Sequence, residues 1–406
     1  MSTTRAVEAV FRIESARIIA GVARIVRDVG IAEEITQDAL VAALEQWPQS
    51  GVPDKPGAWL MATAKHRAID LVRRKETYAR KLAEVGRSLE DAAPPAEPTA
   101  PEDIDDDLLR LIFTACHPVL ATEARIALTL RLMGGLTTQE IARAFLSTEP
   151  TVAQRIVRAK RALAKAGVPF EVPYGADREE RLGSVLEVIY LVFNEGYSAT
   201  AGDDLVRPAL CEDALRLARV LAGLMPDEPE VHGLAALLEF QASRIATRTG
   251  PDGEPVLLAD QNRSKWNRLL IRRGVEALHR AGAGPYSLQA AIAGCHADAV
   301  RYEDTDWRTI AALYGRLVLL IPSPVIELNR AVAVSMADGP AAALPLVDAL
   351  TTEPALRSYH LLPSVRGDLL ERLGRPAEAR AEFERAASLT RNAREETLLR
   401  ERAARL

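Results

Sequence analysis

The sequence predicts an all-α protein. Its 406 residues are 48% hydrophobic but only 5% aromatic, and the hydrophobic residues are mainly Ala, Leu, Val and Ile. Apolar residues also recur at intervals of three and four along most of the chain, and this combination is typical of packed amphipathic helices. The length is sufficient for two or three domains, and four segments can be distinguished along it.

Residues 1–82 form the first segment. Apolar periodicity indicates three helices in it, over 5–28, 31–47 and 57–80. Gly30 suits the end of the first helix, and Pro48 is expected to begin the loop after the second. The third helix has one apolar face and one basic face.

Residues 83–107 form the second segment, which we expect to be a flexible acidic linker. Its part from 88 to 107 contains eight acids and four prolines, without Lys or Arg and with few residues that could form a core. A solvated tether explains this composition. An acidic mimic of nucleic acid, which occupies a cationic channel until nucleic acid displaces it, explains it equally well.

Residues 108–168 form the third segment, a small helical domain that ends in a helix-turn-helix over 135–161. Thr138 can cap the first helix of this motif, and Glu140 follows in its first turn, where an acid is favourable. The second helix follows a short break, with Pro150 in its first turn, where a missing N–H costs nothing.

The second helix of the motif has distinct apolar and basic sides. Its expected core face consists of Val152, Ile156, Ala159 and Leu163. Its other faces carry Arg155, Arg158, Lys160, Arg161 and Lys165, and residues 151–165 contain no acid. A cationic helix after a tight turn suits the major groove of DNA. The alternative is a solvated basic face on an ordinary helical hairpin.

Residues 169–406 form the fourth segment, where helices alternate with short loops. Residues 367–389 have the spacing of one tetratricopeptide repeat, a looser copy covers 326–350, and an earlier helix pair is expected over 181–223. Arrays of this kind present concave surfaces for protein contact. The sequence Asp338-Gly339-Pro340 fits a tight interhelical turn and also a regulatory hinge.

Charge is distributed unevenly along the chain. The net charge is −5; residues 1–168 hold 23 Lys and Arg against 22 Asp and Glu, and residues 169–406 hold 28 against 34. The basic residues of the first part cluster at 65–81 and 151–165. Such clusters, more than the total, favour a nucleic-acid partner.

Several classes of protein are disfavoured. Cys116, Cys211 and Cys295 are far apart, so we expect buried thiols rather than a zinc site or a disulfide framework. The N-terminus lacks a signal-peptide core, and no apolar run reaches the ~18 residues of a membrane span. We therefore expect a cytoplasmic protein with no membrane contact. Without a GxGxxG, Walker, HExxH or GxSxG motif, we expect neither an enzyme nor a bound cofactor or metal.

Three stretches together resemble the extracytoplasmic-function (ECF) sigma factors of bacterial RNA polymerase. They are AEEITQDALVAAL (32–44), AWLMATAKHRAIDLVRR (58–74) and the helix-turn-helix within 128–163. Further segments, among them NEGYSA (194–199), LLADQNRSKW (257–266) and YSLQAAIAGCHA (286–297), are similar to a subgroup with a long tetratricopeptide-like extension. The resemblance covers the whole chain. It implies sigma region 2 over 1–82, sigma region 4 over 108–168 and a regulatory extension over 169–406.

The resemblance also implies roles for particular residues. The residues implied to contact core RNA polymerase are Glu33, Glu34, Asp38 and Leu40. The three acids among them are expected on one side of a helix. The residues implied to contact the promoter −10 element are Trp59, Lys65, Arg67, Asp70, Arg73 and Arg74. There Trp59 could hold an unstacked base or pack in the core, and Asp70 could orient an arginine or reduce local repulsion. The residues implied to contact the −35 element are Thr138, Thr151, Gln154, Arg155, Arg158, Lys160 and Arg161.

The expected partners are therefore core RNA polymerase and promoter DNA. We further expect intramolecular contacts between the C-terminal segment and the sigma domains, with Asp338, Gly339 and Pro340 as a candidate regulatory turn. The main alternative is a stand-alone helix-turn-helix regulator whose repeats sense a ligand or a protein. That alternative gives no role to the acidic helix at 32–44 or to the basic helix at 58–75.

Overall fold

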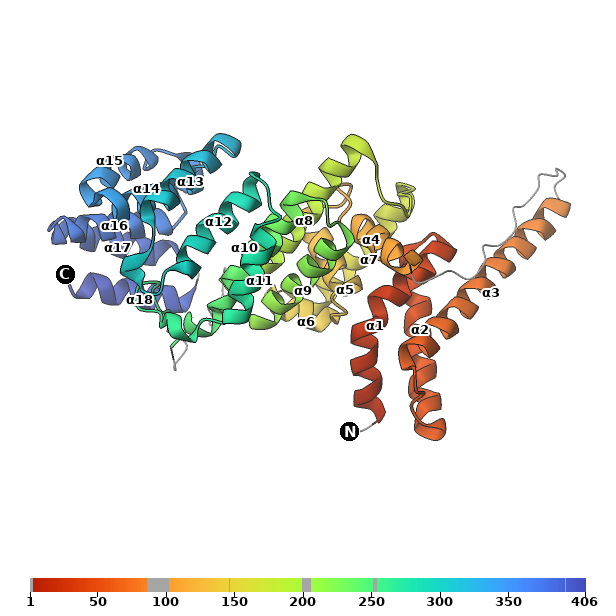
Figure 1. Ribbon diagram of the computed structural model, residues 1–406. Coiled ribbons are helices and arrows are strands. Elements are labelled where there is room, and N and C mark those ends of the chain that lie inside the picture. Colours follow the sequence, from red (N-terminus) through yellow and green to blue (C-terminus); the bar gives the residue numbers. More distant parts are fainter. Residues whose placement is uncertain (1–2, 86–101, 146, 199–205, 251–253, 391) are drawn as a thin grey trace. The chain divides into compact units, whose positions relative to one another are not determined.

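The computed structural model describes residues 3–85, 102–145, 147–198, 206–250, 254–390 and 392–406. Every extended regular element in these ranges is a helix (Figure 1). The all-α prediction is therefore confirmed. The chain divides into two compact units, Met1–Ile189 and Tyr190–Leu406.

The first unit begins with three long helices. They are α1 (Thr3–Val26), α2 (Val29–Ser50) and α3 (Pro56–Val85). Helix α1 packs against both of the others, and it buries Ile18, Ile19 and Val22 there. The three helices agree with those expected from the apolar periodicity, apart from their ends.

Two helix ends differ from the prediction. The break between α1 and α2 lies at Arg27, which has a φ of 55°, and Asp28 caps α2 by accepting a hydrogen bond from the backbone N–H of Ile31 at 2.9 Å. Gly30 therefore lies inside α2 rather than at the end of α1. Pro48 also lies inside α2, because near a helix end a proline removes few intrahelical hydrogen bonds.

Four shorter helices follow in the first unit. They are α4 (Glu102–Ala115), α5 (Thr122–Leu132), α6 (Thr138–Ala144) and α7 (Glu149–Lys165). Helix α4 starts inside the predicted linker, so the last six residues of that linker are helical. Asp107 is only 2% exposed and forms ion pairs with Arg24 at 3.3 Å and Arg110 at 2.7 Å. Most of the predicted linker, with its proposed mimicry of nucleic acid, lies outside the described residues.

Helix α8 (Gly175–Tyr197) begins in the first unit. Arg181 donates a hydrogen bond to the carbonyl of Phe113 at 3.2 Å, and Ser184 donates to the carbonyl of Cys116 at 2.6 Å. Arg125 forms an ion pair with Glu187 at 3.1 Å. These hydrogen bonds and this ion pair connect the start of the predicted C-terminal extension to the segment that precedes the helix-turn-helix.

The second unit consists of successive antiparallel helices (Figure 1). They are α9 (Pro208–Leu224), α10 (Pro229–Ser243), α11 (Arg268–Leu278), α12 (Pro285–Asp298), α13 (Trp307–Leu320), α14 (Pro324–Asp338), α15 (Pro340–Leu350), α16 (Leu361–Arg372), α17 (Pro376–Leu389) and α18 (Ala393–Ala404). Each helix from α12 to α18 packs against the next. This arrangement confirms the predicted tetratricopeptide-like helix pairs.

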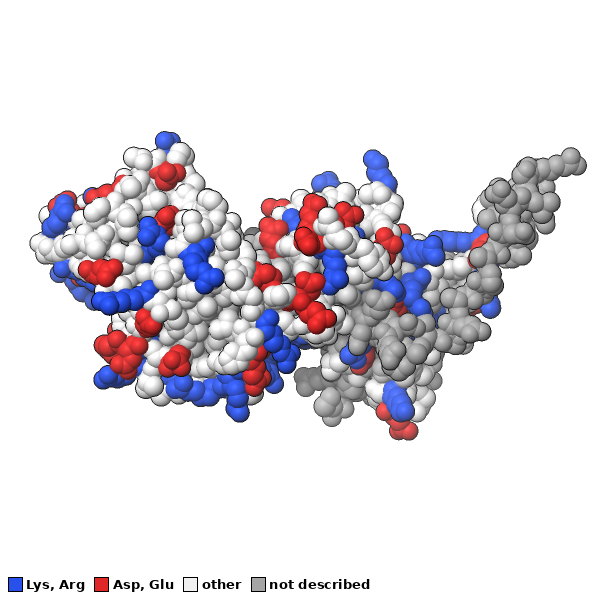
Figure 2. Space-filling view, turned by 45° about the horizontal axis from the view of Figure 1, so that its top comes forward, with Lys and Arg blue, Asp and Glu red and all other residues white. Residues whose placement is uncertain are grey.

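The two predicted repeats correspond to α14–α15 and α16–α17. In the second, Ala379, Phe383 and Ala386 are fully buried, as predicted. Gly374 joins its helices with a φ of 72°, a conformation that favours glycine. Figure 2 shows acidic and basic side chains interspersed over the face of residues 190–406 that this view presents.

Candidate nucleic-acid interface

The helix-turn-helix is formed by α6 and α7, which pack against each other and against α5. Thr137, not Thr138, caps α6. The Thr137 hydroxyl accepts a hydrogen bond from the Glu140 N–H at 3.1 Å, and the Glu140 carboxylate accepts one from the Thr137 N–H at 2.8 Å. This reciprocal pair is a capping box. The predicted cap is wrong by one residue because either threonine could have served.

Helix α7 begins as the sequence predicts. Thr148 caps it, with Pro150 in its first turn. Its buried residues are Val152, Ile156, Ala159 and Leu163, which are the four predicted core positions. This apolar stripe leaves the rest of the helix surface for polar side chains.

The predicted −35 contacts on α7 have different environments. Thr151, Gln154, Arg158 and Arg161 are exposed, while Arg155 and Lys160 are partly buried. Thr138 is also partly buried, and its hydroxyl donates to the Glu149 carboxylate at 3.2 Å. Neither Arg158 nor Arg161 has a carboxylate partner among the described residues. These two guanidinium groups are therefore available to phosphates or to base edges.

Helix α3 carries the predicted −10 contacts. Leu60, Ala64 and Ala68 are fully buried along one side, and the exposed side presents Arg67, Asp70, Arg73 and Arg74, with Lys65 partly buried. Asp70 orients no arginine among the described residues. Instead, Arg67 forms an ion pair with Asp38 of α2 at 3.4 Å, because Asp38 faces α3 across the helix pair.

Trp59 lies near the start of α3 and is partly buried. Its ring meets the buried ring of Trp47 edge to face, with the centroids 5.5 Å apart. This is ordinary aromatic packing, and it gives Trp59 a structural role whether or not it also stacks on a base.

The predicted polymerase contacts on α2 do not share one surface. Glu34 and Asp38 are exposed and lie one helical turn apart, and Leu40 is partly exposed. Glu33, however, is 5% exposed. Successive residues of a helix are rotated by about 100°, so Glu33 faces inward while Glu34 faces solvent. The expectation that the three acids lie on one side is wrong for Glu33.

Glu33 is held by two cations of the helix-turn-helix domain. Its carboxylate accepts a hydrogen bond from Arg131 of α5 at 2.6 Å, and it forms an ion pair with Lys160 of α7. Gln37 donates to the same carboxylate at 2.9 Å. The acidic helix and the recognition helix are thereby joined. Sequence reasoning overlooked Arg131, since nothing local marks an arginine that pairs 98 residues away.

The candidate regulatory turn connects α14 and α15. Gly339 has a φ of 95°, and its N–H donates to the Ser335 carbonyl at 3.1 Å. Asp338 is exposed, and Pro340 starts α15. This is the geometry of a tight interhelical turn.

The cysteines behave as structural thiols. Cys116 and Cys211 are buried and Cys295 is partly buried, and none is in a disulfide. Burial raises the pKa of Cys116 to about 11 and that of Cys211 to about 12, so the reactive thiolate is disfavoured. Within the described ranges, no cluster of His, Cys, Asp and Glu could hold a metal ion. None of the helices described is long and apolar enough to cross a bilayer.

Comparison with known families agrees with this layout. The family model for sigma-70 region 2 matches residues 11–78, and that for sigma-70 region 4 matches residues 110–163. A family of unknown function, DUF6596, matches residues 181–282. Two sigma regions in this order define a sigma factor of the sigma-70 class.

Comparison with individual proteins identifies the family within the sigma-70 class. The ECF RNA polymerase sigma factor SigK of Mycobacterium ulcerans is 30% identical over 151 residues, which cover 36% of this chain and 78% of SigK. Uncharacterized protein R00370 of Rhizobium meliloti is 44% identical over 397 residues, 93% of this chain and 90% of that protein. A tetratricopeptide repeat protein from Parabacteroides merdae aligns at 14% identity and a TM-score of 0.35, over 72% of this chain and 97% of its own. The chain belongs to the ECF RNA polymerase sigma factors.

Proposed function

We propose that this sigma factor binds bacterial core RNA polymerase and directs it to promoters, with α3 at the −10 element and α7 at the −35 element. The observation that carries the proposal is the solvent face of α7. It presents Gln154, Arg158 and Arg161 on a helix whose opposite side is fully used in packing. Glutamine is suited to bidentate contacts with base edges, and arginine to contacts with base edges or with phosphates.

The polymerase contact is assigned to the exposed side of α2. Glu34 and Asp38 form a small acidic surface there, with Leu40 nearby. An acidic surface is complementary to a cationic one and speeds association with it. Asp38 also forms an ion pair with Arg67 of α3. The proposed polymerase contacts and the proposed −10 contacts therefore lie along the same pair of helices.

We further propose that the contacts of Glu33 define a closed state. The −10 and −35 elements are about 25 base pairs apart, which is about 85 Å at 3.4 Å per base pair. Helix α3, which packs against α2, and helix α7, which is joined to α2 through Glu33 and Lys160, cannot reach both elements at once over that distance. Engagement of a promoter by polymerase therefore requires these ion pairs to open.

We propose that the extension over 169–406 controls this opening. Its first residues support the idea, since Ser184 and Glu187 bind the Arg125 side chain beside the helix-turn-helix. Removal of residues 170–406, with Glu187→Gln as a milder change, tests it in promoter-dependent transcription. Unchanged basal and induced output in both variants would contradict a regulatory role.

The central test is run-off transcription with bacterial core RNA polymerase and the full chain, on DNA from upstream of its own gene and its neighbours. A discrete product that is absent with core alone is expected. The double variant Arg158→Ala/Arg161→Ala should lose it, whereas Arg280→Ala/Arg308→Ala, which removes two exposed arginines of the second unit, should retain it. Binding to the same DNA without polymerase, and no co-elution with core, would instead support a stand-alone regulator.

A further inference from the structure

The second unit contains a cavity of about 240 Å³. An engineered cavity of about 150 Å³ in another protein holds benzene, so this one has room for a small organic molecule. Its walls come from the last turns of α8 and from α10, α12, α13 and α14, all within residues 190–329. Apolar side chains such as Phe193, Phe240 and Leu237 form part of the lining. More than half of the lining side chains carry a polar atom, so the cavity suits a molecule that has hydrogen-bonding groups beside an apolar body.

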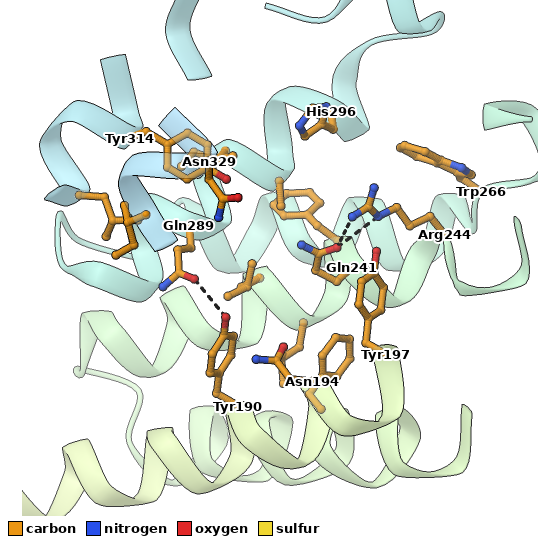
Figure 3. Close-up of a pocket in the computed structure, with 18 residues that line it drawn as sticks. Tyr190, Asn194, Tyr197, Gln241, Arg244, Trp266, Gln289, His296, Tyr314 and Asn329 are labelled. Carbon is orange, nitrogen blue, oxygen red and sulfur yellow. Dashed lines mark hydrogen bonds between the residues drawn. The ribbon is translucent and has the colours of Figure 1, made fainter. Parts of the chain in front are cut away.

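The polar groups of the cavity surround one arginine. Figure 3 shows the guanidinium of Arg244 between Gln241 and the hydroxyl end of Tyr197, with amide side chains on the opposite side. Those amides belong to Asn194, Gln289 and Asn329. The amides of Asn194 and Asn329 offer both donors and acceptors, whereas that of Gln289 is already used: its oxygen accepts from the Tyr190 hydroxyl at 3.4 Å and its nitrogen donates to the Pro285 carbonyl at 3.2 Å.

Arg244 is partly buried and lacks the carboxylate partner that a charge withdrawn from water normally has. Its Nε and one terminal nitrogen both donate to the same neutral oxygen, Oε1 of Gln241, at 3.2 and 2.7 Å. No carboxylate of the described residues pairs with it, and no Asp or Glu lines the cavity. Buried charges are ordinarily paired, since an unpaired one is costly.

A neighbouring arginine shows the contrast. Arg263 donates to the carbonyls of His296 and Ala299, at 2.8 and 2.9 Å, and to the Thr305 hydroxyl. Its role is therefore to bind the end of α12. The side-chain partners of Arg244 are the neutral Gln241 and Tyr197, whose ring centroid lies 5.5 Å from its guanidinium carbon, so no carboxylate of the described residues neutralises its charge.

The cavity also borders ring nitrogens that are unpaired. Nε1 of Trp266 and Nδ1 of His296 are buried and have no hydrogen-bond partner. Burial and the charges of Arg244 and Arg263 lower the pKa of His296 to about 3, so its ring is neutral at pH 7 and can donate or accept. Buried polar groups without partners are rare in folded proteins, and here they border the same cavity as the unpaired arginine.

We infer that this cavity binds a small organic carboxylate, whose anionic group pairs with Arg244 and whose body lies against the aromatic wall. A carboxylate matches the planar guanidinium and supplies the negative charge that the neutral Gln241 lacks. The amides of Asn194 and Asn329, which line the same cavity, are available to select among acids that carry a second polar group. The inference concerns the second unit alone and does not depend on the proposed role in transcription.

The test is thermal unfolding of the full chain with benzoate, 4-hydroxybenzoate and, as neutral controls, the corresponding amides. A ligand at ~10 times its dissociation constant stabilises the folded state measurably, so a saturable rise of Tm by a few degrees is expected with at least one acid and with neither amide. Arg244→Met should abolish the rise, and Arg308→Met, which removes an exposed arginine outside the cavity, should retain it.

A second variant separates loss of binding from loss of folding. Gln241→Glu places a carboxylate within hydrogen-bonding distance of Arg244, so it should raise Tm without ligand and abolish the response to the acids. No response to either acid in the wild-type chain, or a response that survives Gln241→Glu, would overturn the inference. An equal response to inorganic phosphate that requires Arg244 would overturn the choice of an organic acid.

Discussion

Glu33 of α2 and Lys160 of α7 form an ion pair that joins the acidic helix to the recognition helix, although the first was expected to face polymerase and the second DNA. The Glu33 side chain is 6% exposed and that of Lys160 is 20% exposed. The pair therefore lies largely out of water, where charge interactions are stronger than on an open surface.

We predict that Glu33→Gln destabilises the first unit and opens the contact between α2 and α7. Without the carboxylate, Lys160 and Arg131 remain as two neighbouring cations. Breaking a buried pair costs roughly 3 kcal/mol, here at the lower end because both cations keep some exposure. Urea unfolding gives the cost, and hydrogen exchange of α7 gives the opening. Glu34→Gln, at an exposed position, should change stability by less than about 0.5 kcal/mol; equal effects of the two variants would contradict the prediction.

We predict different signatures for two exposed side chains of α7. Arg158→Ala should weaken promoter binding by the holoenzyme on all sequences and reduce the salt slope by about 0.9, as expected for one lost phosphate contact. Gln154→Ala should cost about 1–3 kcal/mol at a single base pair of the −35 element. Binding measured on single-base promoter variants at several salt concentrations separates these outcomes. Identical profiles for the two variants would refute the assignment.

The capping box gives a prediction about stability. Thr137→Ala should destabilise α6 by about 1 kcal/mol, because the N–H of Glu140 loses its acceptor. Thr138→Ala is the matched control, since the Thr138 hydroxyl reaches only Glu149 at the protein surface, and it should have a smaller effect. Chemical denaturation of the two variants compares them directly. A larger loss of stability for Thr138→Ala than for Thr137→Ala would contradict this prediction and indicate Thr138 as the cap.

Gly339→Ala distinguishes a tight turn from a regulatory hinge. Its φ of 95° is unfavourable for alanine, and we expect a loss of about 1–3 kcal/mol. Gly315→Ala is the control, because Gly315 lies inside α13 with open space at its Cβ position, where alanine favours the helix by about 1 kcal/mol. If Asp338-Gly339-Pro340 is only a turn, transcription by Gly339→Ala should follow its folded fraction. A change in induction at full folding would show a hinge.

The lowered pKa of His296 predicts how the free energy of unfolding of the second unit depends on pH. Its folded-state pKa is about 3, below the ordinary value of 6.5, chiefly because of burial. The unfolded chain therefore binds the proton more readily, so stability is fully present above pH 6.5 and falls as the pH is lowered toward 3. The loss at pH 5 should be roughly 1–2 kcal/mol. His296→Gln should flatten this dependence, and His66→Gln, at an exposed position of α3, should leave it unchanged.

Much of the fold was predictable because it is encoded locally. The four core positions of α7 follow from helical periodicity, and Phe383 was expected inside its repeat for the same reason. Helix ends were less predictable. Arg27, rather than the nearby Gly30, adopts the left-handed conformation, and Pro48 is accommodated inside α2.

The contacts between distant segments could not be predicted. Arg131 and Glu33 are 98 residues apart, and nothing in either local pattern indicates the other. The same holds for the cavity around Arg244, whose walls come from five helices. The sequence does show that Gln241 and Arg244 are one helical turn apart, but only the packing of α12, α13 and α14 encloses them.

The ion pairs of Glu33 have a consequence for how strongly polymerase is bound. If polymerase accepts only the open form, its apparent dissociation constant equals the intrinsic constant divided by the open fraction. A closed form favoured by about 2.7 kcal/mol leaves about 1% of the molecules open and weakens the apparent affinity about 100-fold. The interaction of one carboxylate with two cations then sets the concentration at which this sigma factor competes for polymerase, and small changes in that interaction would tune its share of transcription without altering any DNA contact.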